Sequence, residues 1–223
     1  MKMLNLLLNR FFTHLFCLHV RDLKLSNLLY DRDKGTLKIA DFGLCRKMSD
    51  RSVSDLTEGS LPLTPKVVSL WYRPPELLLG SETYSFSIDI WGAACVIGEF
   101  ILGVPIFNGK TEVETLQKII DLLGLPTLVI WPQMKDMPMF KDHCEIQLML
   151  KSKKRHIRYT RSTLMHKFGN LSPSGINLLR SLLQYDPILR FTAKKAAGCK
   201  WFQEGPLPTN EAHMPSFTNK KIP

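Results

Sequence analysis

The sequence predicts a mainly α protein of the α+β class, with a small β-hairpin near its start and helices over most of the remaining chain. Two observations lead to this prediction. Two short apolar runs, 28–30 and 37–39, flank the turn-forming residues 33–35, as in an antiparallel hairpin. The run 88–102 is apolar on nearly every face, which is typical of a helix buried at the centre of a domain.

The first twenty residues are expected to form a helix that faces the core. Leucine and phenylalanine fall on one helical stripe, at Leu4, Leu8, Phe11, Leu15 and Leu18. A basic start followed by an apolar stretch resembles a secretory signal, but polar residues interrupt the stretch, so the core helix is favoured. No later stretch approaches the roughly 18–20 continuous apolar residues that span a bilayer, and no membrane partner is expected.

The boundaries of the next helices can be read from capping and breaking residues. Gly103 and Pro105 should end the central helix. Thr111 and Glu114 have the spacing of a capping box, which predicts a helix that runs from there through Leu123.

The remaining segments are read from composition. Residues 44–69 are polar, irregular and rich in Ser, Thr and Pro, so we expect a loop whose conformation could be switched. Residues 126–170 show little periodicity and are read as an extended insert. Helices are expected at 174–184 and 192–201, followed by a Pro-rich, poorly ordered tail at 204–223.

Composition excludes several classes of protein. The 223 residues are 44% hydrophobic, which is ordinary for a domain with a core, and the five cysteines lack C-x-x-C spacing. Neither a disulfide framework nor a zinc site is indicated, and a reducing compartment fits best. The net charge is +10, but the basic run at 151–158 is read as an exposed loop rather than an import signal or polyanion patch. Without an aromatic-interleaved motif, nucleic-acid binding is not favoured.

Four residues have the spacing of a phosphoryl-transfer site. The chain reads V-R-D-L-K-L-S-N from residue 20, and D-F-G from residue 41. In such a site Asp22 would accept or orient the proton of an acceptor hydroxyl. Lys24 would neutralise phosphate charge, and Asn27 and Asp41 would offer the hard oxygen ligands that magnesium prefers. Each residue alone has a purely structural explanation, so the prediction rests on their fixed offsets.

A longer segment carries a resemblance to a known family. Residues 63–80 read L-T-P-K-V-V-S-L-W-Y-R-P-P-E-L-L-L-G, which resembles the activation and substrate-docking segment of the cyclin-dependent kinases. The same pattern continues in order in D-I-W-G at 89–92, L-L-G-L-P at 122–126, I-W-P at 130–132 and D-P-I-L-R at 186–190. The resemblance covers residues 4 to about 217.

The resemblance implies a domain organisation. Residues 1–203 would form the large, C-terminal lobe of a protein kinase, with 41–76 as its activation segment and 126–170 as the family insert region. The family's glycine-rich loop, strand lysine and partner glutamate are not found in the sequence. We therefore expect the N-terminal β lobe to be absent and the chain to be a truncated form.

The resemblance also implies roles for residues outside the four-residue site. Glu76 and Arg190 would form a buried ion pair. Asp89 would accept the backbone amides of the loop that carries the catalytic aspartate. Ser69 would hydrogen-bond near the catalytic aspartate and lysine, and Leu29 would form the floor of the adenine pocket.

Regulation and substrate choice are implied in the same way. Thr64 matches the family's activating phosphorylation site, with Arg21 and Arg46 as the cations that would receive the phosphate. Val68 and Arg73 match two family residues that keep a backbone carbonyl occupied. The substrate position after the acceptor residue is then best filled by proline, because proline has no N–H that needs a partner.

The function implied is that of a serine/threonine kinase that uses ATP and Mg²⁺ to modify Ser/Thr-Pro sites in cell-cycle or transcription control. A cyclin would be the partner if an N-terminal lobe exists in the full product, with the nucleus and cytoplasm as locations. Two departures from the family are Val20, where the family has His, and a longer segment between Asp41 and Thr64. An inactive large lobe that acts as a protein-binding decoy or scaffold remains the alternative.

Overall fold

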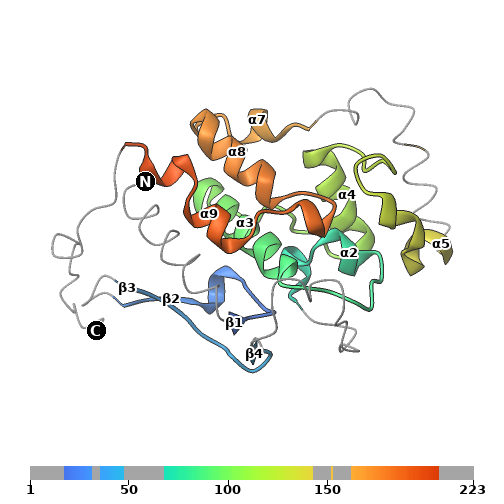
Figure 1. The fold of residues 1–223 in the computed structure, drawn as a ribbon, viewed down its shortest axis with the longest axis horizontal. Helices are drawn as coiled ribbons and strands as arrows, with labels where there is room; N and C mark the ends of the chain where they lie inside the picture. The colour runs from blue at the N-terminus through green and yellow to red at the C-terminus, as the bar shows by residue number, and fades with distance from the viewer. Residues whose placement is uncertain (1–17, 32–35, 48–67, 143–151, 153–161, 206–223) are drawn as a thin grey trace.

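The fold is described from a computed structural model over residues 18–31, 36–47, 68–142, 152 and 162–205. Figure 1 shows the helices gathered into one body, with the small strands along its lower edge. The predicted fold class, mainly α with a small hairpin, is confirmed. None of the helices in the described ranges is long and apolar enough to cross a membrane.

The strands lie in the first part of the described chain, with one 3-10 helix between the first and second strands, and the remaining helices follow the fourth strand. The strands are β1 (Leu18–His19), β2 (Leu28–Asp31), β3 (Thr36–Ile39) and β4 (Arg46–Lys47). The 3-10 helices are η1 (Leu25–Asn27), η3 (Leu70–Tyr72), η4 (Pro132–Asp136), η6 (Pro187–Leu189) and η7 (Lys200–Gln203). The α-helices are α2 (Pro75–Leu78), α3 (Ser87–Leu102), α4 (Glu112–Leu123), α5 (Pro138–Asp142), α7 (Leu164–Lys167), α8 (Pro173–Leu182) and α9 (Ala193–Ala197).

The predicted hairpin is present. Strands β2 and β3 pair antiparallel, in a register that sets Leu28 opposite Ile39. The turn residues 33–35 lie outside the described residues. The hairpin matters for the site because it brings the end of β3, where Asp41 follows, back to the residue before β2.

Two expectations near the hairpin were wrong in part. Leu18, predicted on a helical stripe, lies in β1, and Arg46, expected in an irregular loop, lies in β4, which pairs antiparallel with β1. These strands are two residues long, so they carry no periodicity that a sequence pattern could reveal. The rest of the predicted first helix lies outside the described residues.

The central helix is α3. Every residue from Ile88 to Gly98 is buried, as the apolar run predicted. Gly98 is required there, since a Cβ atom at this position would lie 2.1 Å from Cδ1 of Ile106. Gly103 ends the helix in the left-handed region at φ 72°, which glycine adopts without strain. Figure 1 shows α3 behind α8 and α9, with α4 on its other side.

Helix α4 begins with half of the predicted capping box. The Thr111 side chain accepts a hydrogen bond from the backbone N–H of Glu114 at 3.1 Å. The Glu114 carboxylate accepts from the N–H of Lys110 at 2.9 Å, one residue earlier than the reciprocal bond of a full box. The helix ends at Leu123, as predicted, and Gly124 caps it.

The expectation of an extended insert at 126–170 was wrong for the described part of this segment. It contains η4, α5 and α7, and its Trp131, Leu164 and Phe168 are fully buried. These helices have four or five residues each, too few to show a helical period. The last predicted helix is also shorter than expected, because α9 stops at Gly198 and η7 follows.

A buried ion pair joins α2 to Arg190, the residue that follows η6. Nη1 and Nη2 of Arg190 donate to the two carboxylate oxygens of Glu76, each at 2.6 Å. The two side chains are only 1% and 3% exposed. The guanidinium also donates to the Ser87 carbonyl at 3.1 Å and lies 5.0 Å from the ring centroid of Trp91. Helix α2 and the start of α3 are thereby fixed to Arg190.

We predict that Glu76→Gln lowers the free energy of unfolding by about 3–5 kcal/mol, because Arg190 is then left buried without a counterion. Urea denaturation measures this change. The control is Lys141→Gln, which breaks the exposed pair with Asp136 (3.9 Å) and should cost less than about 1 kcal/mol. Equal costs for the two variants would contradict the structural role of the buried pair.

Candidate functional site

The loop from Val20 to Asn27 is held in place by a carboxylate from the central helix. Asp89, in the first turn of α3, accepts the backbone N–H of Val20 at 2.9 Å and that of Arg21 at 2.8 Å. Arg21 has φ 62°, a conformation that costs a non-glycine residue energy and must be imposed by its surroundings. Asp89 is 4% exposed, so these charge-assisted bonds lie away from water and fix the course of the loop.

The Asp22 side chain is fixed by two neighbours. Its Oδ1 accepts from the backbone N–H of Ser69 at 3.0 Å and from the Ser69 hydroxyl at 2.9 Å. Its Oδ2 accepts from Nζ of Lys24 at 2.5 Å, and Lys24 also donates to the Ser69 hydroxyl at 3.2 Å. The structure therefore brings these three predicted site residues into one hydrogen-bonded cluster.

The cluster favours the ionised form of Asp22. Burial by itself raises the pKa of the carboxyl, but the hydrogen bonds from Lys24 and Ser69 outweigh burial and hold the pKa below its ordinary value. A group of this kind stabilises the fold above the pKa of the unfolded chain, and that contribution is lost as the pH falls through the lowered, folded pKa. At neutral pH Asp22 is a carboxylate, fixed in direction and able to accept a proton.

Asn27 and Asp41 lie at the open end of the β2–β3 hairpin, away from its turn. The Asn27 side-chain amide donates to the Asp22 carbonyl at 2.9 Å, and the Asn27 carbonyl accepts from Ala40 N–H at 2.7 Å. The second bond sets Asp41, the next residue, beside the end of η1. Asp41 is exposed, with φ 62°, and its Oδ1 accepts from Gly43 N–H at 3.3 Å.

The donor set of Asn27 and Asp41 fits magnesium. The Asn27 side-chain nitrogen is used within the loop, which leaves the side-chain oxygen as the end that can face a ligand. Asp41 contributes a carboxylate. No group of three or more His, Cys, Asp or Glu suited to a metal occurs among the described residues. Magnesium commonly uses one or two protein oxygens together with water and phosphate, so two donors suffice.

A second fixed backbone segment lies next to Ser69. Val68 has φ 70°, and its carbonyl accepts from Nε and Nη2 of Arg73 at 3.3 and 3.0 Å. Nη1 of Arg73 donates to Glu112, at the start of α4, at 2.5 Å. The three nitrogens of one guanidinium thus connect a strained peptide to a helix. Glu112 was not predicted from the sequence, where its only signal is an acidic residue in the first turn of a helix.

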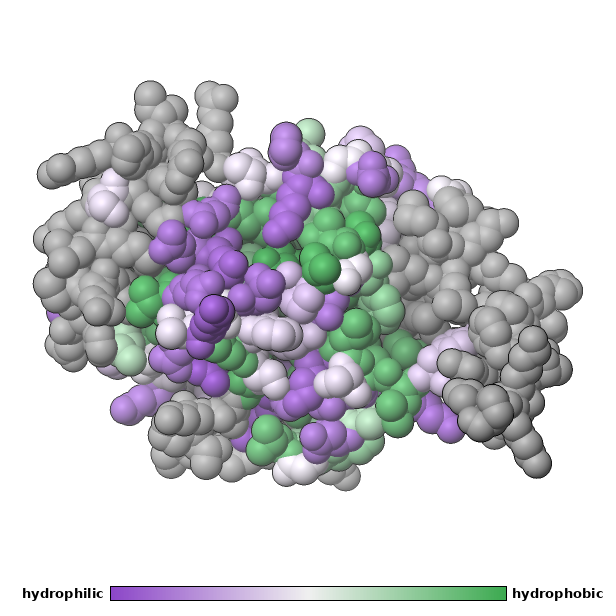
Figure 2. All heavy atoms as spheres, turned by 180° about the vertical axis from the view of Figure 1, so that it is seen from behind, coloured by the Kyte–Doolittle hydropathy of each residue, from purple (hydrophilic) through white to green (hydrophobic). Residues whose placement is uncertain are grey.

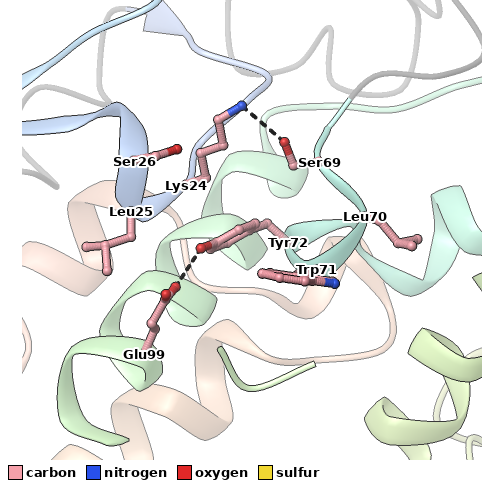
Figure 3. A pocket seen from close by; sticks show the side chains of 8 residues that line it. All are labelled: Lys24, Leu25, Ser26, Ser69, Leu70, Trp71, Tyr72 and Glu99. Carbon is pink, nitrogen blue, oxygen red and sulfur yellow. Dashed lines mark hydrogen bonds between the residues drawn. The ribbon is translucent and has the colours of Figure 1, made fainter. Parts of the chain in front are cut away.

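A groove opens beside the Asp22 cluster. Its volume is about 640 Å³, and its walls come from η1, η3 and the end of α3. Figure 3 shows the lining side chains, which are Lys24, Leu25, Ser26, Ser69, Leu70, Trp71, Tyr72 and Glu99. The Tyr72 hydroxyl donates to Glu99 at 2.6 Å. Sequence reasoning missed Glu99, whose one signal is an acidic residue in an otherwise apolar helix.

The remaining predicted site residues are not gathered into this cluster. Thr64 lies outside the described residues, and Arg46 pairs with His19 between β4 and β1. The Arg21 side chain is buried and donates from Nη1 to the Tyr84 hydroxyl at 3.3 Å, while its Nε has no hydrogen-bond partner within the described ranges. Leu29 is 55% exposed on β2.

Comparisons with known proteins identify the class to which this arrangement belongs. Residues 4–202 match the protein kinase domain, and the chain is a member of that family. The fold resembles the CAK complex from Chaetomium thermophilum bound to ATP-γ-S, with TM-score 0.78, 29% identity, and 96% of this chain and 63% of that chain covered. The yeast RNA Pol II CTD kinase CTDK-1 complex matches with TM-score 0.74 and 34% identity, and the match covers 93% of this chain and 63% of that chain.

Within the kinases, similar curated proteins include several cyclin-dependent kinases. Cyclin-dependent kinase G-1 of Oryza sativa subsp. indica is 42% identical over 88% of this chain and 27% of its own length. Human cyclin-dependent kinase 10 is 39% identical over 92% of this chain and 51% of its own length. The probable cyclin-dependent kinase 10 of Dictyostelium discoideum is 40% identical over 88% of this chain and 49% of its own length. The chain thus spans between about a quarter and half of the length of these relatives.

These comparisons confirm the family resemblance seen in the sequence. Within the family, the motifs at 64–68, 165–168 and 206–217 most resemble cyclin-dependent kinase 10, with number 11 as the near alternative. The first of these two is among the similar proteins. Val20, which stands where the family has His, fits into the core of this fold. Its side chain is 1% exposed, and its backbone N–H donates to Asp89.

We predict that Asp89→Asn lowers the free energy of unfolding by about 1.5–3 kcal/mol, since an asparagine side chain has one acceptor oxygen for two N–H groups. Urea denaturation gives the cost, and hydrogen exchange at Val20 and Arg21 reports where it arises. Asp136→Asn, at an exposed site, is the control. Unchanged exchange at Val20 and Arg21 would show that Asp89 does not hold the loop.

Proposed function

We propose that this chain carries the catalytic loop of a serine/threonine kinase of the cyclin-dependent type, which transfers the γ-phosphate of ATP to Ser/Thr-Pro sites in proteins. The single observation that supports the proposal most is the Asp22 carboxylate, fixed by Ser69 at 2.9 Å and by Lys24 at 2.5 Å beside an open groove. A carboxylate held in this way is ionised and directed before any substrate arrives.

In the proposed reaction Asp22 orients the acceptor hydroxyl and takes its proton as the hydroxyl oxygen forms a bond to the γ-phosphorus. The bond from that phosphorus to the bridging oxygen breaks, and ADP leaves with the electron pair. Lys24 donates hydrogen bonds to the transferred group and offsets its charge, while Ser69 keeps the carboxylate in line. Transfer of this kind depends on alignment and charge stabilisation rather than on covalent catalysis.

Asn27 and Asp41 would hold the magnesium ion of the nucleotide. The ion would supply charge neutralisation at the phosphate oxygens. The chain contributes the spacing, since the bond from Ala40 N–H to the Asn27 carbonyl at 2.7 Å keeps the two donor residues on one end of the hairpin. Leu29, exposed on the same hairpin, would contact the adenine ring.

Selectivity for proline would come from Val68. Its carbonyl is occupied by two nitrogens of Arg73, at 3.3 and 3.0 Å, so a substrate N–H at that position would find no acceptor. A residue after the acceptor that has an N–H would be desolvated without a partner, whereas proline has none to lose. The preference is thus built from an occupied carbonyl rather than from a shaped cavity.

Regulation is proposed from the family resemblance. Phosphate on Thr64 would be received by Arg21 and Arg46, and the buried Arg21 Nε offers a donor for it. A cyclin would bind the complete kinase, which would act in cell-cycle or transcription control in the nucleus and cytoplasm.

We predict that Asp22→Asn lowers kcat for phosphate transfer to a Ser-Pro peptide by about 10²- to 10⁴-fold, the usual contribution of a general base. Transfer of ³²P from γ-labelled ATP to the peptide is the readout. Glu82→Gln, a change at an exposed surface carboxylate, should leave kcat unaltered. Equal rates for Asp22→Asn and the unaltered chain would remove Asp22 from the reaction.

A second prediction concerns the proline preference. Glu112→Gln removes the negative charge that holds one nitrogen of Arg73. It should reduce the ratio of kcat/KM for Ser-Pro over Ser-Ala peptides by about three- to fivefold, as expected for a partly exposed ion pair. The matched control is Glu114→Gln in the same helical turn, which does not contact Arg73. If both variants keep the full ratio, Glu112 has no part in substrate selection.

A second candidate function is protein binding without phosphate transfer, as a decoy or scaffold. It is favoured by the exposure of large apolar side chains on the hairpin and just after Asp41, with Leu29 at 55%, Phe42 at 53% and Leu44 at 40%. A titration of the chain with Mg-ATP separates the candidates. Saturable binding that Asp41→Asn weakens supports the kinase, and a chain that binds Ser-Pro peptide but no nucleotide supports the scaffold.

A further inference from the structure

A second cavity lies beside the buried pair of Glu76 and Arg190, where residues of α2, the segment before α3, η4 and η6 meet. Its volume is about 150 Å³, and none of its lining residues lines the groove beside the Asp22 cluster. Trp131, Met137 and Ile188 give it apolar walls. An apolar cavity of this volume accommodates a group of about the size of a benzene ring. The proposed reaction does not use this space.

Asp186 supplies the cavity with a hydrogen-bond acceptor. The residue is 7% exposed, and its Oδ1 accepts the backbone N–H of Ile188 at 2.9 Å. Within the described ranges its side chain makes no second hydrogen bond and no ion pair. Glu76, the other carboxylate of the lining, is fully engaged, because both of its oxygens accept from Arg190. A carboxylate with unused acceptor capacity in a sheltered position favours a ligand that donates hydrogen bonds.

Trp131 supplies a hydrogen-bond donor. Its side chain is 0% exposed, and its indole N–H is buried without a hydrogen-bond partner in the described part of the chain. The ring stacks on Tyr185, with the two centroids 6.2 Å apart, and this contact fixes its plane. A buried N–H without an acceptor destabilises the fold, so a ligand that brings an acceptor to it would remove that cost.

We propose that this cavity binds a primary carboxamide carried on a small apolar body. The carbonyl oxygen of the amide would accept from Trp131, and its NH₂ group would donate to Asp186. A carboxylate ligand would instead meet the negative charge of Asp186, and a ketone would bring no donor to it. An ammonium group would leave Trp131 without an acceptor. The inference is independent of the proposed function, since it concerns a different set of residues.

The test is an NMR titration of the full chain with benzamide, which is followed at the indole N–H of Trp131 and at the backbone N–H of Ile188. Both signals should shift saturably. The Kd for benzamide should be about tenfold lower than that for acetophenone, which has no donor, and benzoate should bind no better than acetophenone. A parallel titration with N-acetylglutamine N-methylamide identifies the source of the carboxamide. Tighter binding than benzamide indicates a glutamine side chain of a protein, and weaker binding indicates a small aromatic amide.

Asp186→Asn tests the acceptor. Asparagine keeps an oxygen for the N–H of Ile188 but has only one side-chain oxygen, so the gain of benzamide over acetophenone should disappear. The control is Asp136→Asn, at an exposed carboxylate outside the cavity, which should keep the gain.

Three results would overturn the inference: no saturable shift, equal Kd values for benzamide and acetophenone, or a gain that survives in Asp186→Asn. Each of them leaves the proposed function standing, because phosphate transfer is assigned to the Asp22 cluster. If Asp186→Asn fails to fold, the comparison of benzamide, acetophenone and benzoate on the unaltered chain decides.

Discussion

The site depends on one buried carboxylate. Asp89 at the start of α3 takes two backbone N–H groups from the loop at Val20 and Arg21, at 2.9 and 2.8 Å. Helix α3 is buried from Ile88 to Gly98, so its first turn is a firm point of attachment. Asp22 follows directly, and the hydrogen bonds from Ser69 and Lys24 then fix the direction of its carboxylate. Arg190, which is paired with Glu76, also donates a hydrogen bond to the carbonyl of Ser87 and so secures the first residue of the same helix.

The strained residues of the described chain coincide with this site. The non-glycine residues with positive φ are Arg21, Asp41 and Val68. Such conformations cost about 1–3 kcal/mol each and persist only where neighbouring contacts enforce them. Asp89 enforces the first and Arg73 the third, while the bond from Ala40 to Asn27 holds the chain just before Asp41. Figure 2 shows apolar residues interspersed with polar ones over one face of the described part of the molecule.

Features that the sequence allowed us to predict were local or carried by fixed spacing. Turn residues and short apolar runs were enough for the hairpin, and continuous apolar character was enough for α3. The offsets of Asp22, Lys24 and Asn27 were enough to predict a catalytic loop, because the three residues lie within six residues of one another. Family resemblance supplied the long-range partners Asp89 and Ser69, which spacing alone could not supply.

Other features depend on contacts that no local pattern encodes. Glu112 and Glu99 reach the site across distances of 39 and 27 residues, through Arg73 and Tyr72. The pairing of β1 with β4 involves two residues on each side, and the helices of 132–142 and 164–167 are shorter than a helical period can reveal. In each case tertiary packing, rather than intrinsic propensity, decides the local structure.

The proposed chemistry of the site depends on an Asp22 carboxylate that is fixed and ionised by Ser69 and Lys24. An NMR titration of the Asp22 side-chain carbon in the folded chain tests this most directly. The account predicts a pKa below the 3.8 of an ordinary aspartate, which moves upward when Ser69 is replaced by alanine. A pKa at or above 3.8, unchanged in Ser69→Ala, would contradict it.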